Sequence, residues 1–196
     1  MKPRLAFATF AVASLFCAVS AQASIVTYST NLSGAAESPV NASTGTGKAS
    51  VVIDDVLNTM RVIVNFAGLT GLTTNTHIHC CTATALTGTA GVATVSPTFT
   101  NFPMNVAAGS YDFTYNLLAI SGTWNPAFVS ANGGTPASAE AVFLAGLASG
   151  KTYLNIHTTT FPGGEIRGFL VPEPLSAALV LLGLGGLVLT GRRRAK

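Results

Sequence analysis

The chain has 196 residues, of which 48% are hydrophobic and only 9% are charged, and its formal net charge is +3. The positive excess lies at the two ends, because residues 24–171 hold four basic and six acidic side chains, a net charge of −2. Without a basic patch, this central part has no electrostatic basis for binding nucleic acid. It is long enough to bury one hydrophobic core, so we expect one domain over residues 24–171.

The N-terminal 23 residues have the three zones of a secretory signal peptide. Lys2 and Arg4 give a positive start, an almost uninterrupted apolar run follows, and Ala21-Gln22-Ala23 supplies the small-x-small cleavage site. A membrane anchor is the alternative, but the apolar run is shorter than the roughly 20 residues that a spanning helix needs. We therefore predict a signal helix over residues 1–23, removed by signal peptidase between Ala23 and Ser24.

Short β-branched and aromatic runs dominate the central part of the chain. The expected strands are residues 25–32, 48–54, 60–66, 76–80, 111–120, 151–157 and 165–171. Alternation in the third run places Val62 and Val64 on one face and Ile63 on the other. Residues 82–110 form a Thr/Gly/Ala-rich connection, and one this long is usually functional or mobile. Many short strands with turn signals between them predict a mainly β fold, an antiparallel Greek-key-like β-sandwich.

One short helix is expected over residues 136–148. Thr135 can cap it, Pro136 suits its first position, and Gly150 suits its end. The side chains expected on its buried side are Val142, Phe143 and Leu147.

Residues 172–196 form a third segment with a different composition. Pro172-Glu173-Pro174 should interrupt regular structure, because proline fixes φ and has no backbone N–H to donate. A Leu/Gly/Val-rich run without charges follows, and Arg192, Arg193 and Arg194 close it. The run predicts a hydrophobic helix that is marginal for a full span, so we expect transient membrane anchoring. The arginines would stay in the cytoplasm by the positive-inside rule.

This order of a Pro-Glu-Pro triplet, a short hydrophobic helix and a basic cluster resembles the PEP-CTERM sorting signal of Gram-negative bacteria. The resemblance implies that an exosortase-type membrane enzyme cuts near the triplet and releases or transfers the protein outward. It also implies a link to extracellular polysaccharide production. An ordinary C-terminal anchor explains the helix and the arginines, but not the triplet.

Three motifs of the central part resemble the CHRD domain, a module first described in chordin and also found in many bacterial exported proteins. They are Leu32-Ser33-Gly34 with Glu37 and Pro39, then Gly68-Leu69-Thr70-Gly71 leading into His77-Ile78-His79, and finally Tyr153–Thr158 with Pro162–Gly168. The resemblance spans residues 28–170 and implies the β fold, but it assigns no ligand. Where many relatives have a Gly-rich turn after the paired histidines, this chain has Cys80-Cys81 and the long Thr-rich connection.

The three histidines of the chain all lie in these motifs. On an extended strand His77 and His79 project from one face, about 6.6 Å apart, while Ile78 points into the core. His157 lies on a later strand, and the three rings would converge if the two strands are neighbours. Such a nitrogen-rich site would bind Cu or Zn. The alternative is that the histidines hydrogen-bond to backbone groups and tie the fold together.

The pattern is also similar to copper-zinc superoxide dismutase, which has a His-x-His strand and a later strand histidine. The bimetallic dismutase site needs six histidines and an aspartate, so three histidines argue against that activity. A mononuclear site remains open.

Cys80 and Cys81 are the cysteines that remain once the signal peptide is removed. A bridge between neighbours, an intermolecular disulfide and thiolate ligation are the alternatives in an oxidising compartment. If the strand continues past Cys80, Cys81 lies on the face of the histidines and becomes a fourth candidate ligand.

Glu165 and Arg167 share a face of the last strand and should pair with each other or with a neighbouring strand, as a surface ion pair. Neither a catalytic triad nor a phosphate-binding loop nor a pair of glycosidase carboxylates is recognisable, so we assign no catalytic residue.

These features favour an exported binding or structural module, associated with the cell surface or an extracellular matrix. Its expected partners there are matrix polysaccharides or proteins. The alternative function is a mononuclear Cu- or Zn-binding protein, redox-active with copper, that uses His77, His79 and His157.

Overall fold

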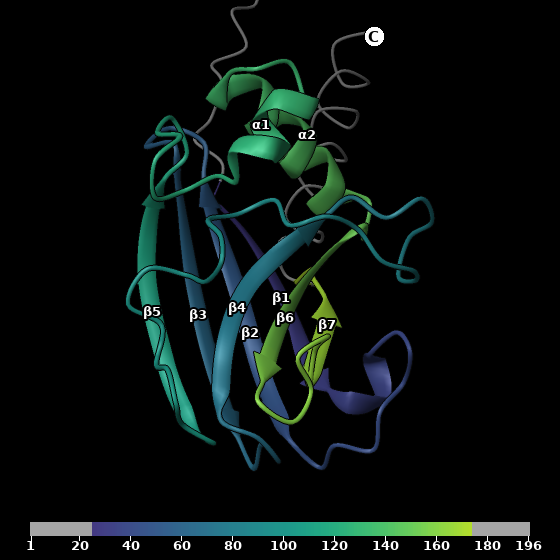
Figure 1. The fold of residues 1–196 in the computed structure, drawn as a ribbon. Coiled ribbons are helices and arrows are strands. Elements are labelled where there is room, and N and C mark those ends of the chain that lie inside the picture. The colour runs from purple at the N-terminus through teal and green to yellow at the C-terminus, as the bar shows by residue number, and fades with distance from the viewer. Residues whose placement is uncertain (1–24, 174–196) are drawn as a thin grey trace, which may run out of the picture.

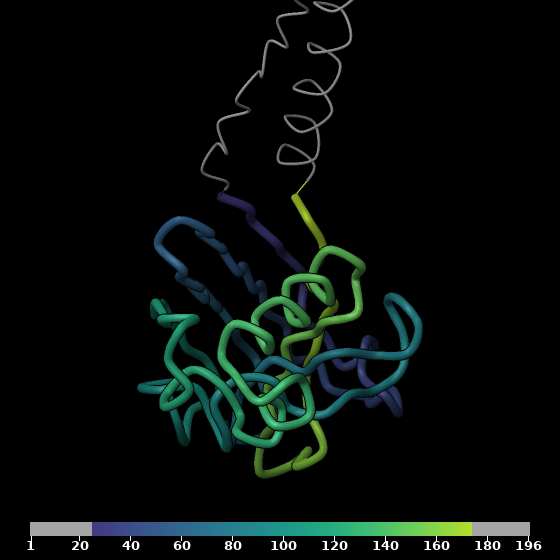
Figure 2. Tube along the Cα trace, turned by 90° about the horizontal axis from the view of Figure 1, so that it is seen from above, coloured from purple at the N-terminus to yellow at the C-terminus, as the bar shows by residue number. Residues whose placement is uncertain are grey.

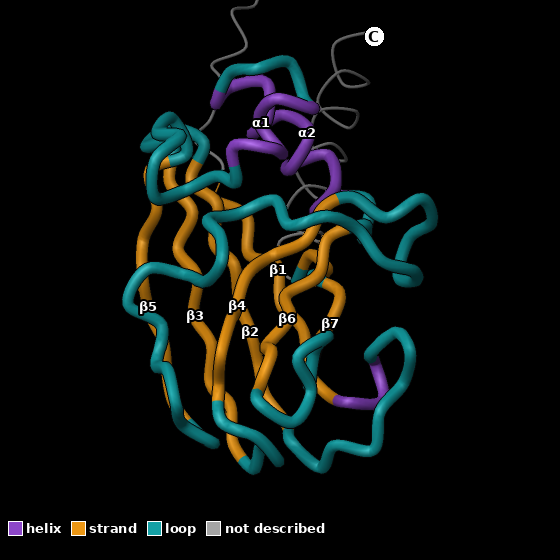
Figure 3. Tube along the Cα trace, in the orientation of Figure 1, coloured by secondary structure: helices purple, strands orange, loops and turns teal. Residues whose placement is uncertain are grey.

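Strands make up most of the regular structure in residues 25–173, the part of the chain that the computed structural model describes (Figures 1 and 3). In chain order the elements are β1 (Ile25–Ser33), the 3-10 turn η1 (Gly34–Ala36), β2 (Thr46–Asp54), β3 (Thr59–Ala67), β4 (Thr73–Cys80), β5 (Gly109–Asn116), α1 (Pro126–Ala131), α2 (Pro136–Ala148), β6 (Thr152–Thr158), β7 (Ile166–Phe169) and β8 (Val171–Pro172). Each predicted strand is confirmed to within a few residues. The predicted strand at 111–120 is too long, because β5 ends at Asn116, and the last one is divided into β7 and β8.

The strands form one curled antiparallel sheet in the order β4-β6-β7-β1-β2-β3-β5, with β8 beside β1. Figure 1 shows β4, β6 and β7 passing in front of β1, β2 and β3. The join is narrow, since β1 and β7 are paired only at Ser33 and Arg167. The mainly β, antiparallel prediction is confirmed, and the two facing layers expected of a sandwich are two halves of a single sheet.

The β2–β3 hairpin shows why the sequence folds this way. Alternate side chains point inward, so that Val51 lies opposite Val62 and both are fully buried. At the turn, the Asp54 carboxylate accepts hydrogen bonds from the backbone N–H groups of Val56 and Leu57. Asn58 adopts a positive φ of 51°, which asparagine tolerates well. The alternation and turn chemistry expected from the sequence are therefore confirmed.

The core lies between the two halves of the sheet. Val62 and Val64 from one half and Ile78, Leu154 and Ile156 from the other are all fully buried in one hydrophobic cluster. Each such side chain stabilises the fold by roughly 1.5–3 kcal/mol relative to an exposed position. The inward residues of β4 and β6 thus hold these strands in place, and their outward residues are free for another role.

Two helices cap one end of the sheet (Figure 1). The predicted helix is α2, with Thr135 in a capping box and Gly150 at a positive φ after its end. Phe143 and Leu147 are buried as expected, but Val142 is 37% exposed. The preceding helix α1 was not predicted, although Asn125 caps it by accepting a hydrogen bond from the Ala127 N–H and Pro126 follows at its first position. With six residues, α1 is too short to show a hydrophobic period.

The long connection between β4 and β5 packs along the free edge of β4. Backbone hydrogen bonds join Cys80 to Gly91, Ile78 to Ala93 and Thr76 to Phe99. This contact supplies the hydrogen bonds that an edge strand would otherwise leave open. The connection also brings two backbone carbonyl groups over the outer face of β4, and these become important at the site described below.

The first and last described residues lie side by side (Figure 2). Pro172 forms part of β8, opposite Tyr28 of β1, and the Glu173 N–H donates to the Thr27 carbonyl oxygen. The expectation that Pro172 interrupts regular structure is wrong, because proline is tolerated in an edge strand where no ladder hydrogen bond is required of it.

Several predictions fall on residues outside the described range. They are the signal helix with its cleavage site at Ala23 and Ser24, and the tail from Pro174 through the hydrophobic run to Arg192, Arg193 and Arg194. Within residues 25–173, no helix is long and apolar enough to cross a membrane.

Candidate metal centre

The three histidines meet on the outer face of the β4–β6 pair. In the antiparallel register His77 lies opposite Asn155, and His157 lies opposite Asn75. Because side chains alternate along a strand, His77, His79 and His157 all point away from the core that Ile78 enters. The predicted convergence depended on the two strands being neighbours, and they are.

The imidazole rings are close enough to share one ligand. The Nε2 atoms of His77 and His157 lie 3.0 Å apart. One ligand nitrogen from each of the three rings lies within 4.8 Å of the others. Two bonds of about 2.1 Å to one ion separate their nitrogens by at most about 4.2 Å. His77 and His157 already satisfy this limit, and the separations that involve His79, at 4.8 Å or less, exceed it by at most about 0.6 Å.

Backbone carbonyl groups orient all three rings. The Nδ1 atoms of His77, His79 and His157 lie 2.9, 2.8 and 2.9 Å from the carbonyl oxygens of Pro97, Ala90 and Pro162, respectively. A carbonyl oxygen can only accept, so each Nδ1 carries the proton and each neutral ring has its lone pair on Nε2. We assign the tautomers from this hydrogen-bond network. A histidine that binds a metal through one ring nitrogen commonly donates the other N–H to such a carbonyl group.

In these tautomers, none of the three Nε2 atoms accepts a hydrogen bond from another group of the described residues. In the assigned tautomers, the lone pairs of His77 and His157 face each other without a shared proton. The Nε2 atom of His79 is buried and has no hydrogen-bond partner among the described residues. Burial lowers the pKa of both His77 and His79 to about 4, and it lowers the pKa of His157 as well. All three rings are therefore neutral near pH 7, as metal binding requires, and their orphaned acceptors fit a cation.

Tyr153 and Arg167 extend the site along β6 and β7. The Tyr153 ring stacks on His79 with 4.6 Å between ring centroids. Arg167 lies on the neighbouring strand β7, and its guanidinium group is 4.8 Å from the centroid of the Tyr153 ring. The Tyr153 hydroxyl accepts a hydrogen bond from the Ala90 N–H at 3.2 Å. Ala90, whose carbonyl group orients His79, is thus held by the ring that stacks on the same histidine.

The expected pairing of Glu165 with Arg167, or of either with a neighbouring strand on the surface, is wrong. Both side chains are almost fully buried, and Arg167 makes its ion pair with Glu37, with 3.7 Å between Nε and Oε2. The Arg167 guanidinium also donates to the carbonyl oxygens of Ala36 and Gly88, which fixes two loops over the site. The partner could not be found from the sequence because Glu37 is 130 residues away in the chain.

Glu165 has a structural role of its own. Its carboxylate accepts hydrogen bonds from the hydroxyl groups of Ser43 and Thr158 and from the backbone N–H groups of Thr70 and Gly71. Burial opposes ionisation, but these four hydrogen bonds outweigh it and lower the pKa of Glu165. Glu165 therefore holds the β3–β4 connection against β6 as an ionised group.

Glu37 lies beside the site as the ion-pair partner of Arg167, a role that the sequence did not predict. It is only 6% exposed, and its Oε1 atom has no hydrogen-bond partner among the described residues. Burial raises the pKa of Glu37 to about 7, although the charge of Arg167 opposes this shift. The signal that could have pointed to it is its place in the first of the three motifs.

Cys81 does not join the histidines. Strand β4 ends at Cys80, and Cys80 and Cys81 form a disulfide between adjacent residues. The sulfur of Cys81 lies 3.8 Å from the carbonyl oxygen of Val142 on α2, at the helix end of the sheet. The candidate ligand set is therefore His77, His79 and His157, and the proposal of Cys81 as a fourth ligand is corrected because the strand turns before it.

Comparison with known families identifies the domain that carries these residues. The sequence profile of the CHRD domain matches residues 28–170. The chain belongs to the CHRD family. The match includes the three histidines, Glu37, Glu165 and Arg167. The outer face of β4, β6 and β7, which carries the histidines and Arg167 and lies beneath the loops of Ala36 and Gly88, is called the covered face below, and all of it is part of the CHRD domain. Neither a curated protein nor a solved structure matches the chain.

Proposed function

We propose that this CHRD protein is an exported binding module that holds one transition-metal ion, copper or zinc, with His77, His79 and His157. The family is typical of secreted proteins and supports an extracellular binding role. The single observation that carries the metal proposal is the orientation of three neutral imidazoles by three backbone carbonyl groups. Because each Nδ1–H is bound to a carbonyl group, the Nε2 lone pair of each ring is the one left for a metal ion.

A purely structural role for the histidines explains the site less well. A histidine that only ties loops together satisfies both of its ring nitrogens, because it has one donor and one acceptor. Here the donors are satisfied, whereas the His79 acceptor is not and the other two acceptors face each other. A bound Cu or Zn ion supplies the missing partner, and copper would add one-electron redox chemistry.

Metal content is the first test. We would express the full chain in an exporting host, load it with copper and with zinc, remove loosely bound ions and measure metal by mass spectrometry. About one equivalent is expected in the parent, and none in a variant with His77→Gln and His79→Gln. Arg61→Gln, on the exposed face of β3, is the control for handling and should keep the metal. No metal in the parent, or equal amounts in parent and histidine variant, would contradict the proposal.

Sorting is a second part of the proposal. We infer that signal peptidase removes residues 1–23 and that an exosortase-type enzyme cuts near Pro172-Glu173-Pro174, after transient anchoring by the hydrophobic run. Because Pro172 pairs with β1 and Glu173 hydrogen-bonds to Thr27, a cut after Glu173 leaves the sheet whole. The mass of the protein recovered outside the cell should correspond to a chain that begins at Ser24 and ends near Glu173. An extracellular chain that keeps the three arginines would contradict this route.

The proposed location is the cell surface or the extracellular matrix, where polysaccharides or matrix proteins are the partners we would test. This association rests on the sorting signal, whereas the metal proposal rests on the histidine geometry, so each can fail alone.

A further inference from the structure

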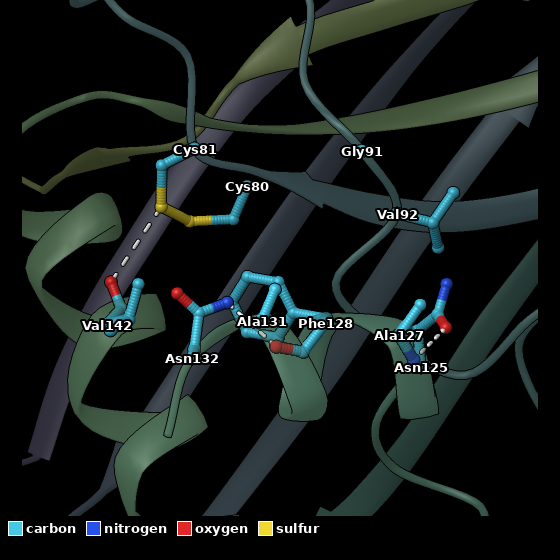
Figure 4. A pocket seen from close by; sticks show the side chains of 10 residues that line it. All are labelled: Cys80, Cys81, Gly91, Val92, Asn125, Ala127, Phe128, Ala131, Asn132 and Val142. Carbon is cyan, nitrogen blue, oxygen red and sulfur yellow. Dashed lines mark hydrogen bonds between the residues drawn. A yellow bond between two sulfur atoms is a disulfide. The ribbon is translucent and has the colours of Figure 1, made fainter. Parts of the chain in front are cut away.

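A pocket of about 500 Å³ opens between α1, α2 and the start of the long connection, at the end of β4 (Figure 4). The disulfide of Cys80 and Cys81 forms one wall, and Phe128 and Val142 are among the side chains around it. None of the ten lining residues is charged. The pocket is therefore suited to a small uncharged molecule, and the disulfide is the one reactive group in its lining.

This disulfide does little for the stability of the fold. A cross-link stabilises a protein mainly by shortening the loops of the unfolded chain, and the effect grows with the number of residues enclosed. Cys80 and Cys81 are neighbours and enclose none. Helix α2 nevertheless makes room for the bridge, because a Cβ atom at Gly146 would lie 2.5 Å from both sulfur atoms. The fold thus accommodates a disulfide that it does not need as a cross-link.

The two sulfur atoms have different surroundings. Cys80 is 5% exposed, and its sulfur lies 3.4 Å from the hydroxyl oxygen of the fully buried Thr152, which is placed to donate a hydrogen bond to it. Cys81 is only half-buried, and its sulfur lies 3.8 Å from the Val142 carbonyl oxygen, which can only accept (Figure 4). If the bridge is opened, a thiolate on Cys80 is therefore stabilised by Thr152, whereas the sulfur atom of Cys81 is the more accessible of the two.

We propose that the pocket is a site of thiol–disulfide exchange, in which a small uncharged thiol reacts with the Cys80–Cys81 bridge. The thiolate form of the thiol attacks Cys81 Sγ, a new S–S bond forms there, and the Cys80–Cys81 bond breaks. Its electron pair goes to Cys80 Sγ, where the Thr152 hydroxyl stabilises the thiolate until it takes a proton.

A second thiol completes the reaction. It attacks the sulfur that the first thiol contributed, releases the Cys81 thiolate and leaves as the small-molecule disulfide. Cys81 then takes a proton and can donate it to the Val142 carbonyl oxygen. Two thiols are oxidised and the bridge is reduced to two thiols, so electrons and protons balance. The same steps in reverse oxidise the cysteine pair.

The site of attack can be mapped on the unmodified full chain. We would add a limiting amount of 2-mercaptoethanol, quench with iodoacetamide and fragment the peptide that contains both cysteines in a mass spectrometer. Mercaptoethanol is expected on Cys81 and the carbamidomethyl group on Cys80. The opposite pattern, or an equal mixture, would overturn the assignment of roles to the two sulfur atoms.

Access through the pocket can be tested with matched tryptophan variants. Ala131 lines the pocket and is exposed on α1, whereas Ala137 is exposed on α2 but does not line the pocket. Ala131→Trp should slow reduction by 2-mercaptoethanol by about tenfold and Ala137→Trp should leave it unchanged, because only the first fills the route to the sulfur. Equal rates in parent and Ala131→Trp would mean that the thiol does not use this pocket, and the proposal would fail.

Thr152 provides a test that does not depend on the pocket walls. Thr152→Val removes the donor and should slow reduction several-fold, whereas Thr152→Ser keeps a hydroxyl and should restore most of the rate. Equal slowing in both variants would show a packing effect and contradict a role for the hydrogen bond.

Discussion

In both halves of the curled sheet, side chains alternate between the core and the outer face, but one outer face is exposed to solvent and the other is buried beneath loops. On β3 and β5, Arg61 and Asp112 form an ion pair in which both side chains are about half exposed, at 52% and 50%. On the other half, Arg167 of β7 pairs with Glu37, and these side chains are 5% and 4% exposed. Alternation thus determines which residues share an outer face, whereas the loops determine whether that face is dry.

The unpaired buried polar groups lie mainly on the covered face. A buried polar group is costly unless it is paired, and in the described part of the chain four buried side-chain atoms lack a hydrogen-bond partner. Three of them, on Glu37, His79 and Asn155, belong to the covered face. The exposed face needs no such arrangement, because water pairs its polar groups. An excess of buried acceptors on one face is what a cation site would need.

The largest effect that separates the two faces is expected from Arg167→Ala. The substitution leaves the buried Glu37 carboxyl without its cation and frees the carbonyl groups of Ala36 and Gly88. We expect the free energy of unfolding to fall by about 3 kcal/mol, the low end for one partner of a buried pair, because Glu37 can take up a proton instead. Urea unfolding of the metal-free protein at pH 8 measures this. A loss below about 1 kcal/mol would mean that the covered face is wetter than its burial indicates.

The strands, α2 and the direction of each histidine were predictable because they depend on local patterns. Val62 and Val64 occupy alternate positions of an apolar, β-branched run, Thr135-Pro136 begins a helix, and His77 and His79 are two residues apart on an extended strand. The sequence could not predict contacts between residues that are far apart in the chain. The pairing of β4 with β6, the carbonyl groups of Ala90 and Pro97 and the contact of Glu37 with Arg167 each join distant parts of the chain.

Two predictions were wrong for related physical reasons. Cys81 was placed with the histidines on the assumption that β4 continues past Cys80, and a strand that ends one residue earlier removes the argument. Glu165 was expected to pair with its near neighbour Arg167 or across the surface, but the N–H groups of Thr70 and Gly71 approach it from another part of the chain. Proximity in sequence is a poor guide to the partner of a buried charge.

A pH-dependent effect of intermediate size is expected from Glu37. Burial raises its pKa from the ordinary 4.5 to about 7 in the folded protein. The folded state therefore binds the proton more tightly, and the stability from this group, present below pH 4.5, is lost as the pH rises through 7. Relative to Glu37→Gln, which mimics the protonated form, the parent should lose about 2 kcal/mol of unfolding free energy between pH 5 and pH 8. A pH-independent difference between the two proteins would show that Glu37 titrates as an exposed carboxyl group does.

The smallest effect is expected on the exposed face, from Arg61→Ala and Asp112→Ala. The hydrogen bond from Arg61 lowers the pKa of Asp112, but water and salt screen a pair whose side chains are half exposed. Neither substitution should change the midpoint of urea unfolding measurably at physiological salt, and the double variant should match the sum of the two. Coupling that persists at high salt would mean that the exposed pair is as specific as the Arg167–Glu37 pair. The loops over β4, β6 and β7 would then not be what distinguishes the two faces, and the case for a specialised site beneath them would rest on the histidines alone.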